Sequence, residues 1–193
     1  MGGVGTDLSD IRPKGSKVHN AALTSTGVIP FMDRYSNTVR EVGQEGRRGA
    51  LMLSISCVHP EAEDFISAKL EQGRVTGANI SIKLTDEFMD CVMNDKPFIQ
   101  YFPVHKPKNE VVPDDIDLSD LNTLKTGKFD GSCYKVISAK ELWNKIIHNA
   151  WRSAEPGVLF WDNILNNTSS KPYYEKGFKP ISTNPCKHYC TYM

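Results

Sequence analysis

Apolar and polar positions repeat along the chain with two different periods. From residue 31 to residue 42 the apolar positions recur every three or four residues, which predicts one buried face of an amphipathic helix. Residues 50–58 form a short, nearly continuous apolar run, which is typical of a strand buried on both faces. Residues 79–84 alternate between polar and apolar side chains, so we expect another strand there.

The same succession of strand and helix continues toward the C-terminus. Helices are predicted to begin at Pro60, at Thr85 and, through a capping-box pattern, at residues 138–141. Short apolar stretches at residues 98–102 and 158–161 have the length of strands. Repeated strand and helix units predict an α/β fold with a mostly parallel sheet covered by helices, either open or closed into a barrel.

Two segments lack this periodicity. The first thirty residues combine several glycines with small polar residues, and we interpret them as a loop that approaches a ligand. The motif Gly2-Gly3-Val4-Gly5 lacks the third glycine and the preceding strand of a dinucleotide-binding fingerprint, so it predicts only a tight turn. Residues 103–131 are polar and rich in lysine and aspartate, and we expect an exposed insertion.

The composition narrows the class of protein and of partner. The 193 residues suit one domain or a large piece of one, and 23 basic residues balance 23 acidic residues. Without net charge the chain has no overall field that would attract nucleic acid or an anionic membrane. No apolar run reaches the roughly 18 residues of a membrane span, and the N-terminus lacks a signal-peptide pattern. We therefore expect a cytoplasmic protein.

The five cysteines are odd in number and scattered, which favours reduced thiols over a disulfide framework. Cys186 and Cys190 are separated by only three residues, but no second close pair accompanies them. Zinc is therefore the weaker interpretation, and we expect no metal site.

Two predicted loops carry cations that suit a nucleotide. Arg12, Lys14 and Lys17 lie beside a glycine and a serine, where charges and backbone amides can bind phosphate, although a solvated basic loop fits equally well. Arg47 and Arg48 lie in a glycine-flanked loop between a predicted helix and a predicted strand. Their planar guanidinium groups can reach a base or a phosphate, while a surface turn that caps the strand is the alternative.

A third segment, residues 182–186, combines an asparagine, a proline and a cysteine. Pro185 restrains Asn184 to an extended backbone, so the Asn184 amide and the Cys186 thiol are held close together on a stiff loop. A lone cysteine is more often a small buried apolar residue than a catalyst, and the pattern alone leaves both readings open.

Taken together, these segments resemble the large, catalytic subunit of ribonucleotide reductase. Two motifs resemble the adenosylcobalamin-dependent class of this family. They are Ser-Thr-Asn-Pro-Cys at residues 182–186 and Arg-Arg-Gly-Ala at residues 47–50. The similarity covers nearly the whole chain up to Cys186. The residues that carry it are 2–16, 25–31, 44–50, 78–81, 154–163 and 182–186.

The resemblance implies a fold and a reaction. The family fold is a ten-stranded α/β barrel of two parallel half-barrels, with the radical cysteine on a loop threaded through the centre. Residues 1–186 would then be the first half-barrel plus the start of that loop, followed by a divergent tail at residues 187–193. Cys186 matches the thiyl position that removes the 3′ hydrogen of a ribonucleotide, and Asn184 matches the asparagine that binds the ribose. The resemblance further implies adenosylcobalamin as cofactor and thioredoxin or another dithiol as reductant.

The resemblance also implies an allosteric effector, a deoxynucleoside triphosphate. Arg12 matches the arginine that binds the effector phosphates, with Lys14 and Lys17 as helpers. Gln44 and Arg48 match the positions that communicate between effector base and substrate base, and Arg47 lies in the same loop. A homodimer is compatible with this interpretation.

The match fails at the C-terminus. The family follows its radical cysteine with glycine and a glutamate that acts as general base, whereas here Lys187 and His188 occupy these positions. We therefore expect an incomplete catalytic subunit that turns over little or nothing alone. The alternatives are a non-catalytic deoxynucleotide-binding or assembly module, and a fragment that does not fold stably because half a barrel exposes sheet edges.

Overall fold

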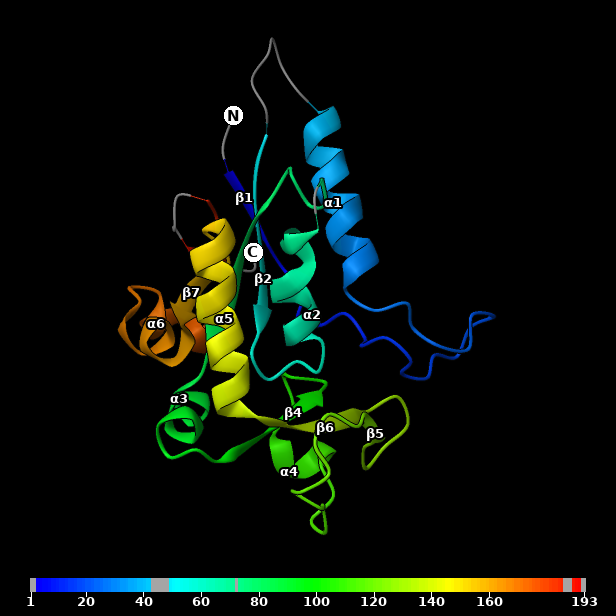
Figure 1. Cartoon of the computed structure of the whole chain (residues 1–193). Coiled ribbons are helices and arrows are strands. Elements are labelled where there is room, and N and C mark those ends of the chain that lie inside the picture. Colours follow the sequence, from blue (N-terminus) through cyan, green and yellow to red (C-terminus); the bar gives the residue numbers. More distant parts are fainter. Residues whose placement is uncertain (1–2, 43–48, 72, 186–188, 192–193) are drawn as a thin grey trace.

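The computed structural model describes residues 3–42, 49–71, 73–185 and 189–191, without the side chains of the last three. Within these residues, four strands form a parallel sheet in the order β1-β2-β3-β7. Figure 1 shows β1 and β2 of this sheet beside the helices α1 (Ile29–Glu41) and α2 (Ala62–Ser67). The strands are β1 (Gly3–Asp7), β2 (Ala50–Ser56), β3 (Asn79–Leu84) and β7 (Gly157–Phe160). The predicted α/β class with a parallel sheet is confirmed.

Helices cover one face of this sheet. They are α1 (Ile29–Glu41), α2 (Ala62–Ser67) and α5 (Ala139–Ser153). Leu53 and Ile55 of β2 and Ile82 of β3 are fully buried in one apolar cluster with Phe65 of α2 and Ile146 of α5. Because alternate residues of a strand point to opposite faces, this row of aliphatic side chains faces the helices and leaves the intervening residues for the other face.

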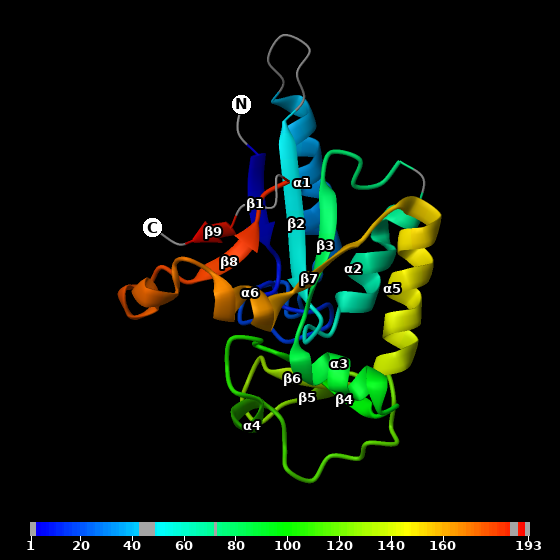
Figure 2. The same cartoon turned by 90° about the vertical axis from the view of Figure 1, so that its left-hand side faces the viewer.

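The opposite side carries a short antiparallel hairpin of β8 (Pro180–Thr183) and β9 (Tyr189–Thr191). Figure 2 shows this hairpin beside β1, on the side of the sheet away from α2 and α5. Between β7 and β8 the chain forms α6 (Trp161–Asn167) and the 3₁₀ helix η2 (Lys171–Lys176). Trp161, expected at the end of a strand, instead begins α6.

The strand predicted at residues 98–102 does not join the parallel sheet. It is β4 (Pro97–Phe102), which pairs antiparallel with β6 (Cys133–Ser138), and β6 pairs with β5 (Lys125–Thr126). Alternate residues of β4 are only partly buried, as an antiparallel sheet with one solvated side allows. A short apolar run does not by itself define the partner of a strand, and for β4 this partner is the antiparallel strand β6.

Two further helices lie beside this smaller sheet. α3 (Asp86–Met93) begins at the N-cap Thr85, as predicted, and α4 (Lys108–Val111) lies between β4 and β5. The 3₁₀ helix η1 (Ala68–Leu70) extends α2. Residues 103–131 were expected to be exposed, yet Val111 and Val112 are buried against Tyr134 in a second apolar cluster. None of the described helices is long and apolar enough to cross a membrane.

Candidate functional site

The sheet face opposite the helices carries small and polar side chains. Asp7 of β1 pairs in register with Ser54 of β2, while Lys83 of β3 pairs with Ser56, two residues further along β2. Lys83 and Ser54 are buried although their side chains are polar. Buried polar groups need hydrogen-bond partners, so this face is expected to hold a connected network rather than an apolar core.

The segment that leads to Asn184 packs directly against β1. A Cβ atom on Gly5 would lie 2.1 Å from the carbonyl oxygen of Thr183, and one on Gly3 would lie 2.7 Å from Cδ of Pro185. Only glycine permits this approach, since the obstacle at Gly5 is backbone. The expectation of a tight turn at residues 2–5 was wrong for the described residues of that motif. The glycines belong to a strand, and they make room for another segment of the chain.

An ion pair crosses the same face. Lys83 Nζ donates to Asp7 Oδ2 at 2.7 Å, and the side chains are only 7% and 14% exposed. Asp7 Oδ1 accepts hydrogen bonds from Ser9 Oγ at 3.0 Å and from Ser54 Oγ at 3.1 Å. Asp7 and Lys83 are 76 residues apart, and no local pattern links them. Sequence reasoning missed both residues, and the only signal was a lysine within an otherwise strand-like segment.

The network continues into β8. Lys83 Nζ also donates to the carbonyl oxygen of Ile181 at 3.3 Å, and Ser54 Oγ lies 3.0 Å from Ser182 Oγ. Ser182 and Thr183 are completely buried, and Asn184 follows them directly at an intermediate level of burial. Cys186 and His188 lie outside the described residues. The predicted proximity of the Asn184 amide to the Cys186 thiol therefore stays a prediction.

The predicted phosphate-binding cations share one loop but point to different surroundings. Arg12 Nη1 donates to the carbonyl oxygen of Lys17 at 2.9 Å and lies against Gly131 of the segment before β6. Lys17 pairs with Asp130 at 3.4 Å, where both side chains are at least half exposed. Lys14 instead lines a cleft on the other side of the loop. The structure thus brings Arg12 and Lys17 together and separates Lys14 from them.

Two buried side chains after β2 hold this loop in place. His59 Nε2 donates to the carbonyl oxygen of Ile11 at 2.8 Å, because its Nδ1 accepts the backbone N–H of Glu61 at 3.1 Å. Burial lowers the pKa of His59 to about 4. Glu61 Oε2 accepts the backbone N–H of Val28 at 2.9 Å, and burial raises the pKa of Glu61. The sequence signal for both was a His-Pro-Glu triplet directly after the apolar strand.

The cleft beside Lys14 has a volume of about 400 Å³ and also contains Glu61 and Arg74. This volume suits a nucleotide-sized ligand, whereas a corrinoid is larger than the drug-sized ligands that such clefts accept. This cleft of the described residues is therefore too small for adenosylcobalamin. Gln44, Arg47 and Arg48 lie outside them. In the part of the chain that the structure describes, no group of three or more His, Cys, Asp or Glu side chains could hold a metal ion.

The two buried cysteines among the described residues, Cys57 and Cys133, are unreactive by environment. Cys57, Cys91 and Cys133 are free thiols. Burial raises the pKa of Cys57 to about 12 and that of Cys133 to about 11, so both remain protonated near neutral pH. Because the thiolate is the reactive form, neither is suited to act as a nucleophile or reducing thiol in this arrangement.

Comparison with known proteins gives a consistent result. Residues 1–193 match the family model described as ribonucleotide reductase, barrel domain. A vitamin B12-dependent ribonucleoside-diphosphate reductase of Thermoplasma acidophilum is 32% identical over 187 residues, which are 96% of this chain and 21% of the relative.

More distant relatives include two types of enzyme. A vitamin B12-dependent ribonucleoside-diphosphate reductase of Mycobacterium tuberculosis is 28% identical over 96% of this chain and 22% of its own length. The ribonucleoside-diphosphate reductase large subunit of Arabidopsis thaliana is 27% identical over 88% of this chain and 21% of its own length. The chain thus spans about a fifth of the length of these curated relatives.

Proposed function

The chain belongs to the barrel-domain family of ribonucleotide reductases, and from this premise we propose that it supplies part of the site that reduces ribonucleotides to deoxyribonucleotides. One observation carries the proposal. The segment with Asn184 lies across the polar face of a parallel sheet. Two glycines of β1 allow its close approach, and Lys83, paired with Asp7, donates a hydrogen bond to it. A substrate bound there is approached by polar side chains on a rigid scaffold, as precise positioning requires.

Within this site Asn184 binds the ribose of the substrate, and Cys186 is the thiol that carries the radical. His188 takes the position of the family's general base, and an imidazole can accept a proton near neutral pH. Adenosylcobalamin is proposed as cofactor because several relatives are named vitamin B12-dependent reductases. We assign none of the described residues to the cofactor. A thioredoxin-type or other dithiol is the proposed reductant.

Arg12, Lys14 and Lys17 are proposed to hold the phosphates of a deoxynucleoside triphosphate effector, with Gln44, Arg47 and Arg48 reading the base. The support is the anchoring of residues 11–28 by buried His59 and Glu61, which fixes the backbone on which the three described cations sit. We further propose that the protein is cytoplasmic and that it forms a homodimer. Sedimentation equilibrium measures the molar mass in solution and so tests the homodimer.

The proposal is tested on the purified chain with ribonucleoside diphosphates and triphosphates. We expect calorimetry to detect ribonucleotide binding that Asn184→Ala weakens about tenfold, since a lost hydrogen bond costs about 1 kcal/mol or more. Absence of ribonucleotide binding would contradict the substrate assignment. With adenosylcobalamin and a dithiol we expect little or no turnover from this chain alone. Deoxyribonucleotide formation that disappears in Cys186→Ala would overturn that expectation.

A second candidate is a non-catalytic module that binds deoxynucleoside triphosphates. The anchored basic loop favours it, since this loop is complete within the described residues. Titration with each deoxynucleoside triphosphate separates the two functions. Binding that is lost in Arg12→Ala, together with no ribonucleotide binding at Asn184, supports the module and contradicts the reductase site.

A further inference from the structure

We propose that Lys83 and Asp7 are positioning residues, which fix β8 on the sheet and thereby set where Asn184 meets the substrate. The inference rests on the proposed function, because it concerns the site at which Asn184 would bind the ribose. It assigns a role to two residues that no sequence motif singled out.

The first argument is how β8 is attached. Among the described residues, β8 pairs through its backbone only with β9, and the hairpin shares no strand pairing with β1, β2 or β3. Its position on the sheet is therefore not fixed by a backbone ladder. The glycines of β1 allow β8 to come close, but a flat glycine surface does not by itself define where along the strand β8 stops.

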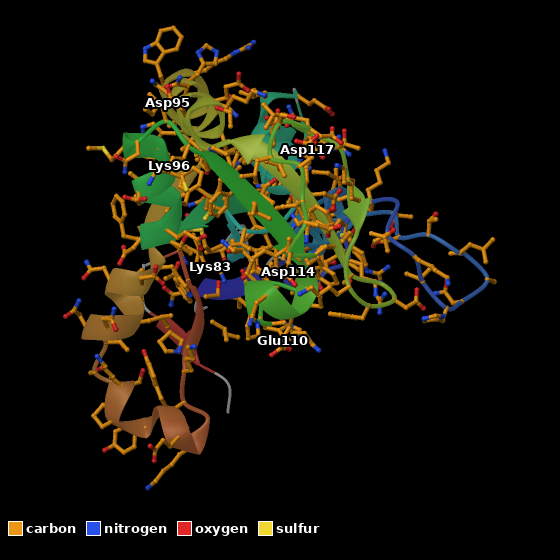
Figure 3. The ribbon with its side chains drawn as sticks, turned by 90° about the horizontal axis from the view of Figure 1, so that it is seen from below. Lys83, Asp95, Lys96, Glu110, Asp114 and Asp117 are labelled. Carbon is orange, nitrogen blue, oxygen red and sulfur yellow. The ribbon has the colours of Figure 1, made fainter. Side chains whose placement is uncertain are left out.

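The second argument is the geometry of Lys83. Its ammonium group has three donors, and it has three neighbours, which are Asp7 Oδ2 at 2.7 Å, Ile181 O at 3.3 Å and the Trp161 ring at 4.6 Å. Figure 3 shows Lys83 beside the blue ribbon of β1 and the red-brown ribbon of β8. One side chain thus joins β1, β8 and the start of α6 from a base on β3.

Asp7 completes the attachment. Its Oδ1 accepts the Ser54 hydroxyl at 3.1 Å, and Ser54 Oγ in turn lies 3.0 Å from Ser182 Oγ. The carboxylate therefore connects to β8 by two routes, through Lys83 to Ile181 and through Ser54 to Ser182. Two contacts at successive residues of β8 define a register, whereas one contact would leave the strand free to pivot.

A purely stabilising role is the competing explanation. Buried ion pairs are poor stabilisers, since apolar residues of similar volume often replace them without loss. They are better at favouring one arrangement over others, because any shift of β8 would leave a buried charge without its partner. Lys83 contacts β8 directly and Asp7 is linked to it through Lys83 and Ser54, so the position of β8 is the property that this pair controls.

The test compares Lys83→Met with a matched control, Lys69→Met. Lys69 also forms a partly buried ion pair, with Glu155 at 2.5 Å, and donates to Ala78 O at 2.7 Å, and within the described part of the chain neither partner belongs to β8. Asp7→Asn is the second variant, because it keeps the size of the side chain if Lys83→Met fails to fold. Lys83→Arg, which keeps the charge, tests rescue.

Two readouts are needed. Hydrogen exchange followed by mass spectrometry reports the protection of residues 180–185, and calorimetry compares adenosine diphosphate with its 3′-deoxy analogue. We expect Lys83→Met and Asp7→Asn to raise the exchange rate of residues 180–185 about tenfold. We expect the parent chain to bind adenosine diphosphate about tenfold more tightly than its 3′-deoxy analogue, and both variants to lose this preference. Lys69→Met should change neither, and Lys83→Arg should restore part of both.

The inference is overturned if both variants keep the parental protection of residues 180–185, or if Lys69→Met reduces it equally. The proposed function fails separately, if the parent chain shows no preference for the 3′-hydroxyl. In that case the exchange comparison still decides whether Lys83 and Asp7 position β8.

Discussion

The segment with Asn184 and the basic loop at residues 11–28 are held by opposite means. On the polar sheet face, the fixing groups are charged and buried, with Lys83 and Asp7 only 7% and 14% exposed. Under the basic loop, the anchor is His59, which burial keeps neutral, while Lys17 and His19 lie at the surface beside Asp130. The segment with Asn184 is thus held by buried charged groups, whereas the polar groups of the basic loop are exposed and can change partners.

The difference follows from the cost of moving each group. A displaced Lys83 would remain in a poorly hydrated place without its carboxylate, so its position is sharply defined. A displaced Lys17 exchanges Asp130 for water at little cost, because exposed ion pairs contribute little. The first arrangement suits the proposed rigid contact with the substrate. The second suits the proposed loop that binds and releases an anionic effector.

The largest expected effect comes from adding one methyl group under β8. Gly5→Ala would place its Cβ atom 2.1 Å from the Thr183 carbonyl oxygen, a backbone atom that cannot rotate away. We expect a loss of about 3 kcal/mol or more in the free energy of unfolding. Gly15→Ala is the control in the basic loop, where nothing lies within 4 Å but φ is +81°. Its expected cost is about 1 kcal/mol.

Urea denaturation of both variants checks this contrast. Equal losses for Gly5→Ala and Gly15→Ala would show that β8 does not press on β1. The curve of the parent chain also tests whether the chain unfolds cooperatively, as the described core implies.

The second prediction concerns pH and the anchor of the basic loop. The folded pKa of His59 is about 4 against 6.5 in the unfolded chain, so the unfolded state binds more protons between these values. The contribution of neutral His59 to the free energy of unfolding is therefore fully present above pH 6.5 and is lost as the pH falls toward 4. Between pH 7 and pH 5 we expect a loss of about 2 kcal/mol from this residue.

Glu61 opposes this trend, because its raised pKa makes the folded state bind protons more readily as the pH falls. The measurement is therefore the difference between the parent chain and His59→Gln in denaturation curves at several pH values. Lys135 and Asp10, the charges that act on His59, stay in both proteins. Identical pH dependence in the two would refute the neutral buried anchor.

The smallest effect is expected at the surface pair. Asp130→Asn should change the free energy of unfolding by less than about 0.5 kcal/mol, because Lys17 and His19 are well exposed. The affinity for a deoxynucleoside triphosphate should rise about twofold, since Asp130 no longer competes for the ammonium group of Lys17. Asp114→Asn is the control, because Asp114, labelled in Figure 3, lies in the insertion and forms a similar exposed ion pair with Lys128. An equal gain in both variants would point to net charge rather than competition.

The hydrophobic periodicity of the sequence predicted those helices and strands whose buried face is formed by regularly spaced apolar residues. The helix expected at residues 31–42 is α1 (Ile29–Glu41), and the strand expected at residues 79–84 is β3. The strand β1 was missed because two of its five residues are glycines, which carry no apolar pattern. Those glycines are explained by β8 and by Pro185 just after it, a segment that follows about 180 residues later in the sequence.

The sequence by itself determined the family, the alternation of strands and helices, and the loop on which Arg12, Lys14 and Lys17 lie. These properties depend on local order, since a motif or a hydrophobic period is complete within a few residues. Only the tertiary structure decided that β4 leaves the parallel sheet, and that Asp7, Ser54, Lys83 and Ser182 form one network. That network depends on strand order and register, which place side chains from four distant segments on one face.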